Sequence, residues 1–165
     1  MRHTCRSQKF FLTLAFFTIL ALHGSAIYAY TLITRGQVNP NLRVNSLGLS
    51  PAYTTAYSNS RDAWFNTSTR ANIIIDNTVS DKKINSAHLT DSYYAVYRPT
   101  GQGSNGRATG FTITLNDRTI PANNNFRQSV IVHEFGHCFS LGDNPSTGNK
   151  SIMNYSRDRY TVVIP

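Results

Sequence analysis

The sequence has 165 residues and a formal net charge of +8, from 16 lysines and arginines and 8 acidic residues. The basic residues are scattered, with no run longer than Lys82-Lys83, so the charge does not indicate a nucleic-acid-binding protein. The positive balance is compatible with acidic substrates or anionic cell-wall polymers as partners, and equally with solubility alone.

Residues 1–29 have the pattern of a secretory signal peptide. Three basic residues precede an apolar run of 13 residues (10–22), and a segment of small residues follows it. The run is shorter than the ~20 apolar residues that a membrane-spanning helix needs. We therefore expect cleavage after Ala29, or after Ala26 as second choice. The mature protein is then secreted, without a stable membrane anchor.

The remaining chain, residues 30–165, is expected to form a single domain large enough for a modest hydrophobic core. Removal of the signal peptide leaves Cys138 as the only cysteine, which excludes an intramolecular disulfide. We expect a monomer that is stabilised by packing, by bound ions, or by both.

Segments typical of strands and helices alternate along this domain, which predicts a mixed α/β fold of the α+β kind. Ser50-Pro51 is typical of a helix start, so a helix is predicted over residues 51–65. A strand over residues 92–97 is expected to end before Arg98-Pro99, and a loop follows over residues 101–106. The predicted strands cover residues 30–34, 42–45, 71–76, 92–97 and 111–116.

A second helix is predicted over residues 126–141, where Asn125 and Gln128 fit a capping box at its start. Its apolar residues recur at helical spacing and form one stripe that faces a core. The stripe consists of Ile131, Phe135 and Cys138. We therefore expect Cys138 in the core rather than at a metal.

Two histidines of this helix lie on a different face. His133 and His137 are four residues apart, so their side chains lie one turn apart on the same side. Two imidazoles in this arrangement can approach one ion at ~2 Å each, as zinc requires. Glu134, directly after the first histidine, can reach a water molecule on that ion. This H-E-x-x-H pattern supplies two metal ligands and a general base.

A zinc site needs a third protein ligand, and Asp143 is the expected one because Gly142 allows the chain to turn back. A glutamate from a later helix is excluded, because Glu134 is the only glutamate of the chain. His88 and Asp158 stay open as alternative ligands.

The sequence HEFGHCFSLGD, residues 133–143, is followed by SIMNY, residues 151–155. These two segments resemble the metzincin clan of zinc metallopeptidases, whose long motif is H-E-x-x-H-x-x-G-x-x-H/D, followed by a turn with a methionine. Within this clan, the chain is similar to the snapalysin-like and matrixin-like members. The aspartate in the motif is similar to that of the snapalysin type, which is small and secreted. The S-x-M-x-Y segment is similar to the Met-turn of astacins.

The resemblance implies a zinc ion (Zn²⁺) and roles for six residues. Glu134 would be the general base and later the general acid, and Tyr155 would stabilise the oxyanion. Met153 would form the floor of the site in the Met-turn. The implied zinc ligands are His133, His137 and Asp143.

The resemblance also implies a small twisted mixed sheet with a backing helix, an active-site helix and a minimal C-terminal subdomain. The expected function is that of a secreted zinc endopeptidase acting on protein or peptide substrates. Water on the zinc ion would be activated by Glu134 and would attack the peptide carbonyl. The alternative is a secreted binding or cell-wall-directed protein that keeps a zinc site without catalysis. Either residues 92–97 or residues 111–116 could form the rim of the cleft.

One residue departs from the motif. Ser140 stands where the family has glycine, at the position where the chain leaves the helix. We expect a left-handed conformation there, which costs a residue other than glycine ~1 kcal/mol.

Overall fold

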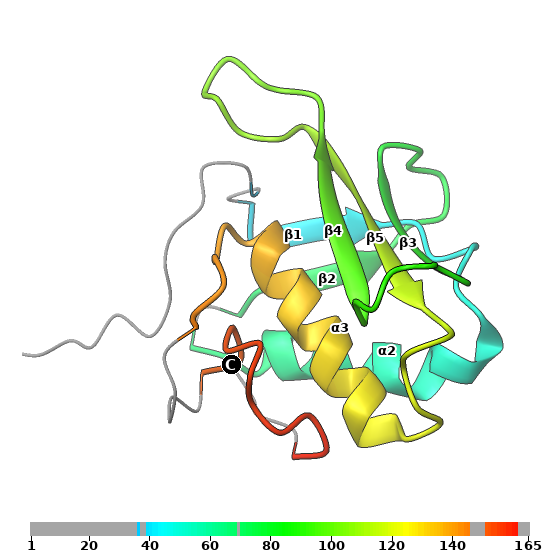
Figure 1. Ribbon diagram of the computed structural model, residues 1–165. Helices are drawn as coiled ribbons and strands as arrows, with labels where there is room; N and C mark the ends of the chain where they lie inside the picture. Colours follow the sequence, from blue (N-terminus) through cyan, green and yellow to red (C-terminus); the bar gives the residue numbers. More distant parts are fainter. Residues whose placement is uncertain (1–35, 37–38, 69, 146–150, 162–165) are drawn as a thin grey trace, which may run out of the picture.

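The computed structural model describes residue 36 and residues 39–68, 70–145 and 151–161, which form a mixed α and β fold (Figure 1). The expected signal peptide and the strand predicted over residues 30–34 lie outside these described residues. None of the described helices is long and apolar enough to cross a membrane. The elements are β1 (Asn41–Val44), η1 (Pro51–Tyr53), α2 (Thr54–Phe65), β2 (Asn72–Ile75), β3 (Lys82–Ala87), β4 (Ala95–Thr100), β5 (Gly110–Asn116) and α3 (Asn124–Cys138).

The described strands form two small sheets that meet at one bridge. β1 and β2 pair in parallel, and in the other sheet β5 lies between β3 and β4. β3 is parallel to β5, whereas β4 is antiparallel to it and forms the edge of that sheet. A parallel bridge between Asn45, directly after β1, and Lys83 of β3 joins the two sheets at one point. The strands of both sheets therefore lie side by side, with parallel and antiparallel pairs.

The two helices pack against each other and close the core against the strands. Figure 1 shows α3 crossing in front of α2, with β3, β4 and β5 above the two helices. α2 contacts β2, and α3 contacts β4. The Trp64 indole N–H donates to the Val132 carbonyl at 3.1 Å, which ties α2 to α3 through a buried hydrogen bond. The predicted stripe of α3 is confirmed, because Ile131, Phe135 and Cys138 are fully buried.

The starts of the helices are set by capping side chains. The Ser50 hydroxyl accepts from Ala52 N with Pro51 at the first position, so the predicted start of the first helix is confirmed. The predicted cap of α3 was wrong by two residues. Asn123, not Asn125, is the cap, and its side-chain oxygen accepts from Phe126 N at 3.0 Å. Three consecutive asparagines offered equivalent side chains, and the sequence could not separate them.

The strand predicted over residues 92–97 was displaced at both ends, because β4 begins at Ala95 and continues to Thr100. Asn116 N donates to the Tyr94 carbonyl at 2.9 Å. In an antiparallel pair the backbone groups alternate in direction, so Pro99 turns its nitrogen away from β5. Its missing N–H therefore costs no bond in the ladder, as is typical of proline in an edge strand.

Candidate metal centre

The last turns of α3 carry the two histidines of the motif on the side away from the core stripe. His133 is buried and His137 is nearly so, and their ring centroids are 4.9 Å apart. His137 also lies against the ring of Tyr97 from β4, with 5.8 Å between the centroids. This face of α3 therefore looks toward β4.

Backbone carbonyls orient both imidazoles. His133 Nδ1 lies 3.0 Å from the Ile152 carbonyl oxygen, and His137 Nδ1 lies 2.8 Å from the Leu141 carbonyl oxygen. A carbonyl only accepts, so each Nδ1 carries the proton and each Nε2 keeps a lone pair. In metal-binding histidines, a hydrogen bond from the ring nitrogen that does not bind the metal fixes the tautomer and the ring orientation.

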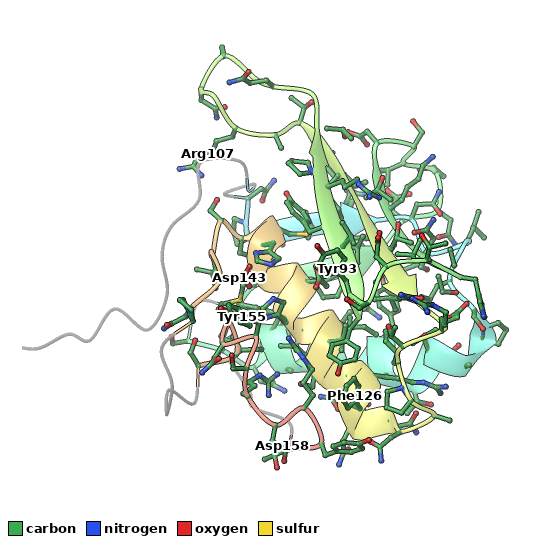
Figure 2. All side chains as sticks on the ribbon, in the orientation of Figure 1. Tyr93, Arg107, Phe126, Asp143, Tyr155 and Asp158 are labelled. Atoms are coloured by element: carbon green, nitrogen blue, oxygen red, sulfur yellow. The ribbon has the colours of Figure 1, made fainter. Side chains whose placement is uncertain are left out.

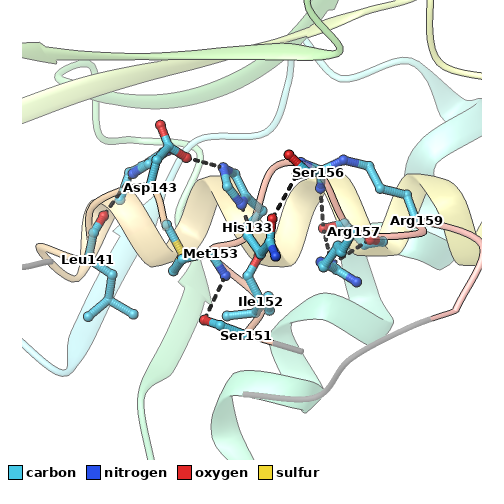
Figure 3. A network of polar contacts seen from close by, with 12 residues as sticks. His133, Leu141, Asp143, Ser151, Ile152, Met153, Ser156, Arg157 and Arg159 are labelled. Carbon is cyan, nitrogen blue, oxygen red and sulfur yellow. Dashed lines mark hydrogen bonds and ion pairs between the residues drawn. The ribbon is translucent and has the colours of Figure 1, made fainter. Parts of the chain in front are cut away.

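Asp143 completes a group of three acceptors. Its Oδ1 lies 3.1 Å from His133 Nε2 and 3.7 Å from His137 Nε2. Figure 3 shows the His133 ring between this carboxylate and the backbone of Ile152. The three ligand atoms lie within 4.8 Å of one another. Tetrahedral ligands at ~2.0–2.1 Å from zinc are ~3.3 Å apart, so these separations suit such an ion.

The contact between Asp143 and the histidines requires a positive charge. Two lone pairs and a carboxylate repel one another unless a cation or a proton lies between them. When His133 carries a proton on Nε2 as well, its hydrogen bond to Asp143 is the main cause that lowers the pKa of this carboxyl below its usual value. A metal ion in the same place would supply the same compensation, so the residues present fit a divalent cation.

The end of α3 directs Asp143 back toward the histidines. Ser140 N donates to the His137 carbonyl, and Leu141 N donates to the Gly136 carbonyl at 2.9 Å. This is the Schellman pattern of helix termination, with Ser140 at the left-handed position. Ser140 has φ of 68°, so the expected left-handed conformation is confirmed. The helix ends at Cys138, earlier than the predicted Leu141, because this turn breaks it.

A side chain from the β4–β5 loop is bound to the same turn. Arg107 Nη1 donates to the Ser140 hydroxyl at 2.9 Å. Figure 2 shows Arg107 reaching toward the end of α3 from the loop that projects beyond the two strands. Serine in place of glycine therefore gains one hydrogen bond at the cost of a strained backbone.

We predict that Ser140→Gly is more stable than Ser140→Ala by about 1 kcal/mol. Both variants lose the bond to Arg107, but only alanine keeps a Cβ at positive φ. The difference in free energy of unfolding in urea therefore measures the backbone strain of alanine, reduced by the larger unfolded-chain entropy of glycine. An alanine variant as stable as the glycine variant would contradict the left-handed turn.

The segment after residue 150 packs against α3 and supports the site. Met153 is fully buried, and a Cβ placed on Gly136 would lie 2.3 Å from its sulfur atom. Only glycine at position 136 therefore lets Met153 pack directly against the helix, one residue before His137. Asn144 N donates to the Met153 carbonyl at 2.8 Å, so the same segment also fixes the chain next to Asp143.

Glu134 lies beside the group in a cleft of about 820 Å³. It is buried, and the loss of solvation raises its pKa to about 7, although the charges of His137 and Arg159 oppose this shift. A carboxylate with a pKa near neutrality is suited to accept and return a proton.

The cleft lies between α3 and β4. Residues 92–97 line it together with His133, Glu134, His137 and Asp143. Of the two segments considered for the rim, residues 92–97 therefore occupy it, and β5 is the central strand behind them. Tyr155 also lines the cleft and is 54% exposed. Figure 2 shows Tyr155 close to Asp143, and Tyr93 at the start of the rim.

The remaining candidates lie away from the group. His88 is exposed on the chain after β3, and it is not part of the cluster found among the described residues. Asp158 is exposed, and its carboxylate accepts from Tyr160 N and the Thr161 hydroxyl. Cys138 is fully buried in the core, as predicted, and burial raises the pKa of its thiol. The structure therefore brings Asp143, and none of these three, to the histidines.

Arg159 is the residue of the cleft that the sequence did not indicate. It is buried and lines the cleft beside Glu134 and Asp143. No spacing rule marks it, because its place depends on the path of the chain after Met153.

Comparisons with known proteins do not assign the chain to a family. No protein-family model matches the sequence, and no curated protein matches it.

Proposed function

We propose that this protein is a secreted zinc endopeptidase that hydrolyses peptide bonds in protein or peptide substrates. The observation that carries the proposal is the approach of His133 Nε2, His137 Nε2 and Asp143 Oδ1 to one point. Two imidazoles and one carboxylate are a donor set that suits zinc in catalytic sites, where one position stays open. The metzincin resemblance of residues 133–155 supports the same proposal.

Glu134 performs the proton transfers. When bound, a zinc ion supplies a Lewis acid that polarises the peptide carbonyl and makes a water molecule more acidic. Glu134 accepts the proton of the attacking water and later donates a proton to the leaving amine. Because Glu134 is buried beside the cleft, its carboxylate stays close to the reacting groups. Bulk water then competes less for hydrogen bonds to this carboxylate.

Two residues of the SIMNY segment have different roles in this proposal. Tyr155 extends into the cleft, where its hydroxyl donates to the oxyanion that forms on the attacked carbonyl. Met153 contacts no substrate, because it is fully buried. It positions the metal ligands by packing against Gly136 and by fixing the chain at Asn144.

An extended substrate would lie along β4. This strand is the edge of its sheet and borders the cleft, so a peptide can be added alongside it by strand pairing. Pro99 offers no N–H on the side away from β5, which ends this pairing toward the β4–β5 loop.

Peptide cleavage with and without metal tests the proposal. The purified mature protein is expected to cleave unfolded casein, to lose this activity after chelation, and to regain it when one equivalent of zinc is added. Cleavage that persists in the metal-free protein would contradict the proposal. Zinc binding without cleavage of any substrate would favour the alternative, a secreted binding or cell-wall-directed protein.

A further inference from the structure

Arg159 is a buried cation with few partners. The residue is 7% exposed. Nη1 is 3.5 Å from the Ser129 carbonyl oxygen, which is a long hydrogen bond, and the buried Nε has no partner. A guanidinium has five N–H donors, and leaving them unused in a buried place costs free energy. The guanidinium of Arg159 therefore has donors that the described residues do not use.

The guanidinium belongs to the wall of the cleft. Arg159 lines the cleft with Glu134 and Asp143, and none of the ion pairs found among the described residues involves Arg159. Burial lowers the pKa of Arg159 below its usual value, and the charges of Glu134, Tyr94 and Asp143 oppose this shift only in part. The positive charge of Arg159 is therefore incompletely compensated.

A bound zinc ion would make this imbalance larger. The two carboxylates of the cleft, Glu134 and Asp143, balance a divalent ion in charge. Arg159 would then remain as an excess positive charge in the wall of the same cleft. An anionic group of the substrate would remove this excess.

Aromatic rings hold the guanidinium in place. Its central carbon lies 5.9 Å from the centroid of the Tyr94 ring, and Tyr94 packs edge-on against Phe126 with 5.0 Å between centroids. Tyr160 also packs edge-on against Phe126, with 5.1 Å between the ring centroids. The packed rings and the burial of Arg159 restrict the rotamers of the arginine, so a carboxylate would bind to a preorganised group.

We propose that Arg159 is a specificity-determining residue that selects substrates with a carboxylate next to the scissile bond. The inference rests on the proposed peptidase function. The carboxylate can come from an aspartate or glutamate side chain within an extended peptide, or from the C-terminus of the substrate. Both sources offer the same planar acceptor pair, which a guanidinium binds through two parallel hydrogen bonds.

The test compares matched peptides that differ in one charge. One pair carries aspartate or asparagine at each position that flanks the cleaved bond, and a second pair ends in a free carboxylate or an amide. We expect kcat/KM of the zinc-loaded protein to favour the anionic member of one pair by about 10-fold or more, as charge-assisted hydrogen bonds allow. Arg159→Gln is expected to reduce this ratio to about 1, because glutamine cannot compensate the charge.

Arg157→Gln is the matched control. Arg157, drawn beside Arg159 in Figure 3, also reaches Ser129, since its Nη2 donates to the hydroxyl at 2.5 Å. Arg157 is not among the residues that line the cleft. This variant is expected to keep the preference for the anionic peptide. Arg159→Gln with an unchanged ratio would overturn the inference, even if both rates fell. An equal loss for both peptides is such an unchanged ratio, and it would indicate that Arg159 only positions Glu134.

Binding separates this inference from the proposed function. Fluorescently labelled peptides are titrated into zinc-loaded Glu134→Gln protein, with and without Arg159→Gln. Binding of the anionic peptide that is about 10-fold tighter than binding of its neutral match, and is lost with Arg159, would support the inference without any cleavage. Equal affinities for the two peptides would overturn it, whereas absent cleavage with selective binding would overturn only the peptidase function.

Discussion

Glu134→Gln is expected to lower the rate of peptide cleavage by about 10²–10⁴-fold, because general acid–base catalysis contributes effects of this size. Glutamine has nearly the same shape as glutamate but cannot accept a proton from water. Glu134 is the only glutamate of the chain, so no other glutamate can replace it. The measurement is kcat for a defined peptide, with the zinc content of each sample determined in parallel.

The control for this prediction is the metal itself. Glu134 is not one of the three grouped ligand residues, so the variant is expected to keep one zinc ion per chain. A variant that is inactive because it has lost zinc would not establish the role of the base. A variant with bound zinc and an unchanged cleavage rate would contradict the assignment of Glu134.

Asp143→Ala is expected to weaken zinc binding by at least about 100-fold. Loss of a residue that only supports a ligand costs 10–100-fold in affinity, and loss of a ligand should cost no less. The carboxylate also offsets the positive charge of the ion next to two neutral imidazoles. Competition with a chromophoric chelator measures the affinity of wild type and variant.

Asp158→Ala provides the matched comparison, because Asp158 is an exposed acid outside the group. It is expected to leave zinc affinity within about 2-fold of wild type. Comparable losses in both variants would indicate a general electrostatic effect rather than coordination. Full affinity in Asp143→Ala would contradict the proposed set of ligands.

Strongly periodic segments could be predicted from the sequence. In the strand FTITLN (β5), the apolar residues alternate with polar ones, and in α3 the residues Ile131, Phe135 and Cys138 recur at helical spacing. The structure buries the apolar residues of both elements, as expected. β3 was missed because KKINSA is mostly polar, and Ile84 is its only buried residue. Its strand character comes from its partners β5 and β1, which local sequence does not reveal.

The candidate site also has residues that a local sequence pattern predicts and residues that depend on tertiary contacts. His133, Glu134 and His137 follow from spacing on one helix, which a sequence pattern records directly. Asp143 required the left-handed turn at Ser140, a local feature that the sequence also suggested. Arg159 enters the cleft through tertiary contacts with Ser129 and Tyr94, so no local pattern could identify it.

Crystals of the zinc-loaded protein, measured at the zinc absorption edge, test the central claim most directly. We predict one strong anomalous peak that lies ~2.0–2.1 Å from His133 Nε2 and His137 Nε2 and ~2.0–2.2 Å from an Asp143 carboxylate oxygen. Zinc found only elsewhere, for example at His88 or Asp158, or no ordered zinc in a folded chain with these three side chains ordered, would contradict the account.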